Sequence, residues 1–489
     1  MTLDVQSAPP STSAPTTISG LGWTKATWVL LVVLCGALFL DGLDLSMVGV
    51  ALPSIGSDLH LSASALQWIV SGYVLGYGSF LLLGGRASDL LGRRRVFLTA
   101  VGVFGVASVV SAALSNDFAL IALRFVKGAS AGFTVPAGLS IITTTFAEGP
   151  ARNRALSIYT VCGASGFSLG LVFGGLLTEL GWRATFLVPG PVAIALVIAG
   201  IKVIPTSVRE RVALAHFDLA GALTSTASLL VLVYAVVEAP QRGWGDPVTI
   251  TLLGVSALLM ATFIAIELRH QRPLVRLGIL RSGSLVHANL SAAAMFGGYV
   301  SFQFVVTLYV QNSLGWSPLG MAMAFLPAGL IVAVSATRMG IVLERVRTTV
   351  LIGVGLAALL AGYGLFLRVG TTDNYANFLL PAMLLLGIGF ALCFPAVNAQ
   401  ATSGVADHEQ GLASGLLNTS MQIGGAVVLA VVTAILTSAG ASHGAVQSGD
   451  LLPGMRTALG VVVGVSIAGL LYTAARLRTP RRTEFVLAD

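Results

Sequence analysis

The chain has 489 residues, of which 55% are hydrophobic and only 10% are charged, whereas about 25% of the residues of a typical soluble domain are charged. Its mean hydropathy is +0.90. This composition excludes a soluble globular enzyme. Three cysteines, all within apolar segments, exclude a disulfide framework, and their spacing with the histidines does not match a metal site.

Apolar segments of span length follow one another along the chain, separated by short polar stretches. A helix needs about 20 apolar residues to cross the hydrocarbon core of a bilayer, and all its backbone groups are then bonded internally. We therefore predict an all-α polytopic membrane protein. Fourteen spans are predicted, at 27–50, 66–84, 96–114, 118–146, 154–178, 185–204, 217–238, 248–267, 285–311, 319–338, 349–368, 377–400, 411–437 and 456–475.

Two basic turns suggest that the chain contains two related halves. Gly84–Arg95 and Arg338–Arg347 each follow the second helix of a possible six-helix unit. Such repeats are common in transporters, which bind substrate between them near the bilayer midplane. The predicted parts are a disordered tail (1–25), a six-span half (26–204), two inserted spans with connectors (205–282), a second six-span half (283–476) and a basic tail (477–489). None of them is a soluble catalytic domain, so no enzyme activity is expected.

The basic residues predict the orientation of the chain, because Lys and Arg accumulate in cytoplasmic loops. Placing both termini and every second loop on one side puts 21 of the 27 Lys and Arg residues there. The net charge of +7 therefore reports membrane orientation and does not imply a nucleic-acid partner. The exceptions are Arg183, Arg242, Arg368 and Arg456 on the other side, with Arg124 and Lys127 inside the fourth span.

Two carboxylates lie in the middle of the first span, at Asp41 and Asp44. An ionised side chain at the bilayer centre costs about 2.5–3.5 kcal/mol on insertion scales. The two residues are three positions apart and so share one helix face. Arg124, inside the fourth span, can snorkel or pair with one of these acids. Proton or cation coupling is the favoured interpretation; polar contacts that only hold helices together, or a structural ion pair, are the alternatives.

Glycines and isolated polar residues also stand out within the spans. Gly166, Gly170 and Gly174 step by four along the fifth span and end beside Gly175. Such a face lets helix backbones approach closely and suits helices that move against each other, although ordinary packing is the alternative. The candidate substrate-cavity residues, which could equally form bonds between helices, are Tyr73, Tyr159, Gln303, Asn398, Asn418 and Gln422.

The turn Gly85-x-Ala87-x-Asp89-x-x-Gly92-Arg93-Arg94 resembles the loop motif of the major facilitator superfamily, and the chain is similar to its fourteen-span drug:proton antiporters. Ala87 stands where Leu is usual and Leu90 where Arg is usual. The resemblance implies a major facilitator fold with two extra helices. It also implies that Asp89 and the arginines form a cytoplasmic latch that breaks during the conformational switch; a simple positive anchor is the alternative.

Further segments of the chain also carry the resemblance. Residues 43–53 resemble the first-span signature, which implies that Asp44 carries coupling and that Asp41 is an addition. Arg124 resembles the fourth-span motif, with Lys127 in place of the usual glutamine. Residues 166–175 resemble the fifth-span motif of exporters, with Leu171 where proline is usual.

The resemblance implies a proton-coupled antiporter that exports amphipathic organic molecules or antibiotics by alternating access. It would be a monomer in the bacterial cytoplasmic (inner) membrane, with protons, lipid and a small-molecule substrate as its partners. No cofactor or metal is expected. ATP drive is excluded because a phosphate-binding loop needs Gly-Lys-Ser/Thr, and no lysine here follows a glycine. A symporter importing a nutrient and a non-transporting scaffold are the alternatives.

Overall fold

A computed structural model describes residues 23–147, 150–205, 218–270, 277–369, 375–405, 410–440 and 452–478. Most of the two predicted tails therefore lies outside the described residues. Within these ranges, 14 helical segments are long and apolar enough to cross a membrane, which confirms the number predicted from the sequence. The protein is an all-α, multi-pass membrane protein.

The helices follow the predicted order. The first half comprises α1 (Lys25–Leu59), α2 (Ala63–Leu91), α3 (Arg93–Ala113), α4 (Asp117–Thr145), α5 (Pro150–Glu179) and the short α6 (Arg183–Leu187), which continues as α7 (Pro189–Val203). The inserted pair is α8 (Leu219–Arg242) and α9 (Pro247–Arg269). The second half comprises α10 (Gly283–Leu308), α11 (Pro318–Arg345), α12 (Thr348–Phe366), α13 (Leu380–Thr402), α14 (Gln410–Ser438) and α15 (Met455–Arg478).

Polar residues and glycine mark the ends of the helices. Ser62 and Asn116 accept hydrogen bonds from the first-turn backbone N–H groups of α2 and α4, at 3.2 and 2.9 Å. Gly92 separates α2 from α3 with a φ of +93°, a conformation that side-chain-bearing residues rarely adopt. The chain therefore reverses direction where the sequence stops being apolar.

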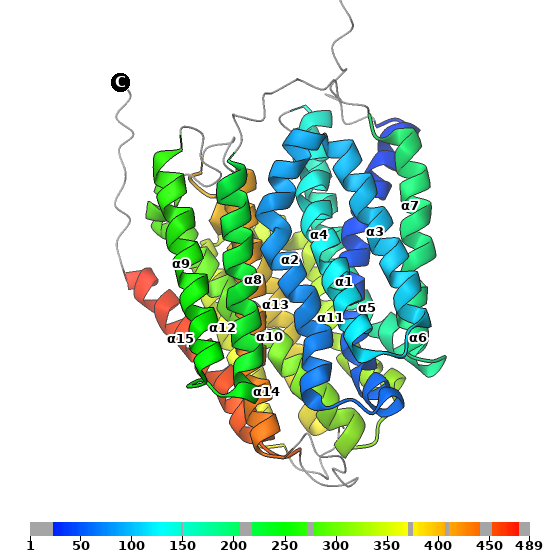
Figure 1. The fold of residues 1–489 in the computed structure, drawn as a ribbon, viewed down its shortest axis with the longest axis vertical. Coiled ribbons are helices and arrows are strands. Elements are labelled where there is room, and N and C mark those ends of the chain that lie inside the picture. The colour runs from blue at the N-terminus through cyan, green and yellow to red at the C-terminus, as the bar shows by residue number, and fades with distance from the viewer. Residues whose placement is uncertain are drawn as a thin grey trace, which may run out of the picture.

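The two halves meet along two seams. In the first half α1 packs on α5 and α2 on α4; in the second, α10 packs on α14 and α12 on α13. Across the bundle, α5 packs on α11 and α2 packs on α14. The inserted helix α8 lies against both α2 and α14, with α9 outside it, and Figure 1 shows this pair at one side of the bundle.

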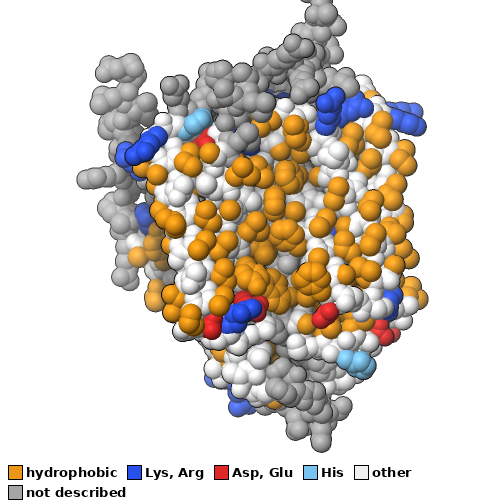
Figure 2. Space-filling view, viewed as in Figure 1, with side chains coloured by type: hydrophobic (Ala, Val, Ile, Leu, Met, Phe, Trp, Pro, Cys, Tyr) orange, Lys and Arg blue, Asp and Glu red, His pale blue; other side chains and the backbone are white. Residues whose placement is uncertain are grey.

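Side-chain hydrogen bonds fasten α8 to α9. The Ser228 hydroxyl donates to the Ser256 carbonyl and the Ser256 hydroxyl to the Ser228 carbonyl, each at 3.0 Å. Figure 2 shows hydrophobic side chains over the middle of this face, with Lys, Arg, Asp and Glu toward its two ends. That distribution is what a bilayer requires of the surface that it contacts.

The glycine ladder of α5 packs against α1. A Cβ atom added at Gly166 would lie 2.3 Å from the Phe39 carbonyl oxygen, and one at Gly170 would lie 2.5 Å from the Leu43 oxygen. At these positions only glycine lets the two backbones approach so closely. Because α1 and α5 belong to the same half, this ladder holds one half together rather than forming a seam between halves.

Gly174 and Gly175 serve different neighbours. A Cβ at Gly174 would lie 2.8 Å from the Met47 Cα, so this residue continues the contact with α1. A Cβ at Gly175 would lie 2.4 Å from the Ala322 Cβ on α11. Gly175 is thus the member of the predicted motif that faces the other half.

Candidate functional site

A cluster of buried charges joins α1 to α4. The Asp44 carboxylate accepts a hydrogen bond from the Arg124 guanidinium on Oδ2 and one from the Lys127 ammonium on Oδ1. All three side chains are fully buried. The structure therefore brings Asp44 and Arg124 together, as the sequence suggested. It adds Lys127 as a second cation, so that each carboxylate oxygen has its own positive partner.

Helix geometry explains how α4 presents both cations to one carboxylate. Arg124 and Lys127 are three residues apart and share a face. Arg124 is held further by a hydrogen bond from its Nε to the Ile69 carbonyl at 2.9 Å. Its guanidinium carbon lies 4.5 Å from the centre of the Tyr73 ring, a favourable cation–π distance. Tyr73, predicted as a cavity residue, instead supports the charge cluster from α2.

Lys127 lies among aromatic rings. Its ammonium is 4.7 Å from the centre of the Phe104 ring on α3 and 5.3 Å from that of Phe186 on α6. Ring faces attract a cation without supplying a counter-charge. The Asp44 carboxylate is therefore the only ionised acceptor bonded to this ammonium among the described residues.

Asp41 lies one helical turn from Asp44 and has no cation of its own. Its side chain is 6% exposed, and Oδ2 has no hydrogen-bond partner among the residues that the structure describes. The Tyr73 hydroxyl donates to the Asp41 backbone oxygen at 3.3 Å and not to the carboxylate. Asp44 and Lys127 interact with Asp41 electrostatically. The two predicted acids are thus close together but differ completely in their bonding.

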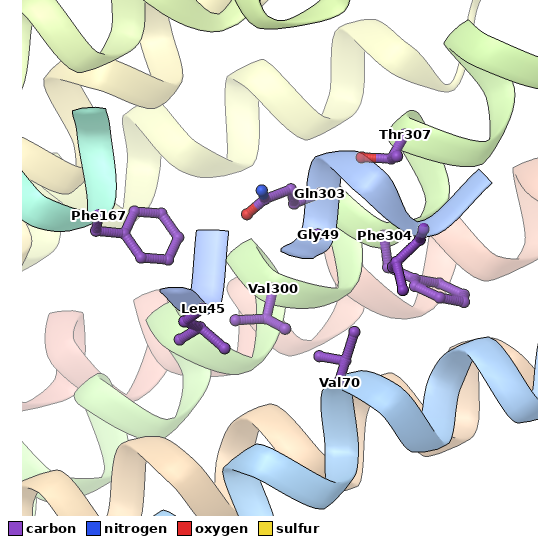
Figure 3. Close-up of a pocket in the computed structure, with 9 residues that line it drawn as sticks. Leu45, Gly49, Val70, Phe167, Val300, Gln303, Phe304 and Thr307 are labelled. Atoms are coloured by element: carbon purple, nitrogen blue, oxygen red, sulfur yellow. The ribbon is translucent and has the colours of Figure 1, made fainter. Parts of the chain in front are cut away.

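A small cavity of about 20 Å³ lies between the halves. Gln303 points into it toward the Phe167 ring (Figure 3); its side chain is 7% exposed, and its amide nitrogen has no partner in the described part of the chain. A space of this size holds about one water molecule and is far smaller than the ~300 Å³ of the smallest ligand pockets, so the two halves are nearly closed here in this structure. The lining residues are Leu45, Gly49, Leu52, Val70, Phe167, Val300, Gln303, Phe304 and Thr307.

Aromatic rings from both halves meet beside this cavity. Phe167 on α5 lies nearly parallel to Phe390 on α13, with ring centres 6.3 Å apart and an interplanar angle of 11°. Tyr299 on α10 contacts both rings, at 5.7 and 5.1 Å. The cavity region is therefore apolar and aromatic, and the Gln303 amide nitrogen and the Thr307 hydroxyl are its buried donors without a hydrogen-bond partner among the described residues.

The remaining predicted cavity residues lie elsewhere. Tyr159 donates from α5 to the Val135 carbonyl of α4 at 3.4 Å. Asn398 and Asn418 each donate to the carbonyl four residues earlier in their own helix, at 2.8 and 2.9 Å. Gln422 packs across the α2–α14 seam, where a Cβ added at Gly78 would lie 2.8 Å from it. Of the six candidates, Gln303 lines the cavity.

The apolar cavity residues were not singled out in the sequence. Leu45, Gly49 and Leu52 recur at helical spacing on α1, and Val300, Phe304 and Thr307 surround Gln303 on α10. Their chemistry is the same as that of residues that face lipid. The sequence gives one usable indication: residues three or four positions from Asp41 or Gln303 share a helix face with them.

The predicted latch is described only in part. The side chain of Asp89 lies outside the described residues. Gly85 has open space around it, with the nearest atom 3.9 Å from an added Cβ. Arg93 begins α3, and Arg94 donates to the Ile201 carbonyl of α7 at 2.5 Å. The observed bond therefore ties α3 to α7 at the basic end of the bundle.

Comparisons with known proteins agree with this architecture. The family model of the Major Facilitator Superfamily matches residues 34–429. The chain is 37% identical to the puromycin resistance protein pur8 of Streptomyces alboniger, over 85% of this chain and 83% of that protein. It is 34% identical to the cephamycin export protein CmcT of Amycolatopsis lactamdurans, over 88% and 90%. The crystal structure of the POT family transporter PepTSo shares the fold, with a TM-score of 0.66 at 15% identity over 92% and 99% of the two chains.

Proposed function

The chain belongs to the Major Facilitator Superfamily, and on that premise we propose that it exports amphipathic organic molecules, including antibiotics, by proton-coupled alternating access. It is a transporter and not an enzyme. The direction of transport is supported by two relatives, one named for puromycin resistance and the other for cephamycin export.

Proton coupling is supported by the buried charges of the first half. Asp44 and Arg124 are fully buried and paired, and Asp41 lies one turn away. Ionisable groups at such depth are costly, so proteins retain them where charge moves. Moving one charge across the membrane is worth about 2.3 kcal/mol per 100 mV. In this proposal, the charge that crosses the membrane field is carried by a proton bound within this cluster.

The residues that line the cavity support a substrate that is apolar over most of its surface and that binds when alternating access widens the space between the halves. The lining holds one amide and one hydroxyl, from Gln303 and Thr307, and no charged side chain. A divalent cation would need counter-charges in this low dielectric, and Asp44 is already bonded to two cations. We therefore propose neutral, zwitterionic or singly charged amphiphiles as substrates, in preference to divalent cations.

We propose that both termini lie in the cytoplasm of a bacterial cell, an orientation that the basic turns support. We also propose that the chain is a monomer in the inner membrane. On the opposite side, hydrogen bonds join the halves: Gln311 donates to the Val50 carbonyl at 2.8 Å, and the Leu319 backbone donates to Glu179 at 3.3 Å. Substrate would then enter from the cytoplasmic side. In the latch hypothesis, Asp89→Asn slows transport with little effect on substrate affinity.

Everted membrane vesicles test the proposal. Acidifying the vesicle lumen should drive accumulation of a labelled planar dye inside, and an uncoupler should abolish it. Vesicles without the protein are the control. Uptake by right-side-out vesicles driven by an inward proton gradient would indicate an importing symporter instead. A substrate panel completes the test: stronger protection against divalent biocides than against monovalent or neutral drugs would contradict the proposed substrate class.

A further inference from the structure

We propose that Asp41 binds and releases the transported proton, while Asp44 remains an ionised anchor between two cations. This rests on the proposed proton-coupled export. It assigns the two roles in the order opposite to the one implied by the family resemblance, in which the residue at the position of Asp44 carries coupling.

Asp44 is held by cations on both sides of its carboxylate. Both of its carboxylate oxygens accept charged hydrogen bonds, one from Arg124 and one from Lys127, and all three side chains are fully buried. Protonating Asp44 would break one of these bonds and leave two cations in the protein interior without a counter-charge. Such an arrangement is strongly unfavourable. Asp44 is therefore a poor group for repeated proton exchange.

Asp41 has a carboxylate oxygen that can take up a proton. Its Oδ2 is buried without a hydrogen-bond partner among the described residues. A bare carboxylate oxygen in such a place is costly, and an added proton relieves that cost. An O–H bond forms at Oδ2 on loading and breaks on release, with the proton coming from water on one side and leaving to water on the other.

The surroundings of Asp41 allow this exchange. On its own helix the charged neighbour of Asp41 is Asp44, and α4 contributes Lys127. Arg124, also on α4, interacts electrostatically with the neighbouring Tyr73. The other titratable neighbours are phenols: Tyr73 and Tyr77 of α2 and Tyr159 of α5, all of which interact with Asp41 electrostatically. Phenols stay neutral when buried and can donate hydrogen bonds to either form of a carboxyl group.

The net charge of the cluster depends on the protonation of Asp41. Asp44, Arg124 and Lys127 together carry one positive charge. An ionised Asp41 brings the cluster to neutrality, and a protonated Asp41 leaves it positive. Asp41 and Lys127 are both departures from the family pattern, and their charges are opposite. The extra lysine is thus the counter-charge that lets an extra carboxylate ionise inside the bilayer.

Position on α1 connects the exchange to substrate. Asp41, Leu45 and Gly49 follow one another at four-residue steps and share a helix face, and the latter two line the cavity. A change in the charge of the cluster therefore acts on the same helix face that lines the cavity.

Purified protein in proteoliposomes tests the assignment with two readouts. One is uphill transport driven by a pH gradient, and the other is substrate exchange at equal pH on both sides. Asp41→Asn should lower uphill transport at least tenfold and keep exchange within twofold, with a flat pH profile. Asp58→Asn is the matched control, because it removes a carboxylate from the half-exposed end of the same helix and should leave both readouts unchanged.

Lys127→Gln adds a readout that a purely structural role of Asp41 would not move. Without the nearby ammonium, the pH profile of exchange should shift toward alkaline pH, and this shift should be absent when Asp41→Asn is also present. Full gradient-driven transport by Asp41→Asn, or a Lys127→Gln profile that does not move, would overturn the assignment. If the unaltered protein shows no response to a pH gradient, the proposed function itself fails.

Discussion

Each half of the molecule joins its first helix to its fourth by a buried polar contact, but the two contacts differ in charge. In the first half, Asp44 of α1 meets Arg124 and Lys127 of α4. In the second, His287 of α10 meets Gln400 of α13 with ring and amide nitrogens 2.5 Å apart. The second contact extends through His287 to the Thr473 hydroxyl of α15 at 3.0 Å. No Asp or Glu side chain among the residues that the structure describes takes part in it.

The difference shows that this fold does not need buried charges to hold its helices together. Hydrogen bonds between membrane helices contribute about 0.6–2 kcal/mol each. Removing one partner of a buried ion pair costs about 3–5 kcal/mol, because the other charge is left uncompensated. The second half uses neutral hydrogen bonds, whereas the first half keeps a buried ion pair, whose disruption is more costly. The proposed proton coupling would require such charges and would account for this difference.

The largest effect is expected from Asp44→Asn. The substitution leaves Arg124 and Lys127 buried without a counter-charge, so the free energy of unfolding should fall by about 3–5 kcal/mol and export should be lost. Thermal unfolding in detergent measures the first effect and vesicle efflux the second. Adding Lys127→Gln should restore part of the stability, since one of the stranded cations is then removed. Unchanged stability of the single variant would break the contrast between the halves.

Gly170→Ala should have the next largest effect. Its Cβ would lie 2.5 Å from the Leu43 carbonyl oxygen, so α5 must move away from α1, and overpacking of this kind costs about 1–3 kcal/mol. The folded yield and the unfolding temperature report it. Gly254→Ala is the control, because an added Cβ there meets nothing within 4 Å. Equal effects of the two substitutions would contradict close packing as the cause.

A smaller effect is expected from His287→Ala. It removes two hydrogen bonds of the neutral network, so stability should fall by about 1–2 kcal/mol while the ratio of protons to substrate stays the same. Proton release measured together with substrate flux gives that ratio. A folded His287→Ala protein that no longer responds to a pH gradient would place coupling in the second half.

Gln303→Leu should have the smallest effect and should act on the substrate alone. The variant removes the unpaired amide donor of the cavity, so substrates with a carbonyl or hydroxyl acceptor should bind about 0.5–1.5 kcal/mol more weakly. Substrates without an acceptor should bind as before, and coupling should not change. Titration of dye binding with matched pairs of substrates measures this. Equal weakening of both classes would remove Gln303 from the list of specificity residues.

The helices were predictable from the sequence because a bilayer imposes a length and an apolar composition on each of them. The meeting of Asp44 with Arg124 was predictable for a related reason, since ionised groups at mid-depth must find each other. Lys127 occupies a position where the family pattern gives no charge, and only the structure shows that it shares the same carboxylate.

The cavity was harder to predict because its lining is chemically the same as a surface that faces lipid. Phe167 and Val300 carry no polar mark in the sequence, and only packing shows which side of the helix they occupy. Some polar residues were wrongly predicted to line the cavity, because a polar side chain within a span can form its hydrogen bond inside its own helix. The Asn398 and Asn418 amides bond to carbonyls of their own helices, the nearest acceptors where water is absent.

The inserted helices have a consequence for how a molecule dissolved in the lipid can reach the interior. Of the two seams between the halves, the one between α2 and α14 is covered by α8. Hydrogen bonds between Ser228 and Ser256 join α8 to α9. No described helix packs over the seam between α5 and α11. Among the described helices, α8 thus covers one seam and leaves the other uncovered, so in the proposed transport an amphiphile in a leaflet would approach from the side of Gly175 and α11.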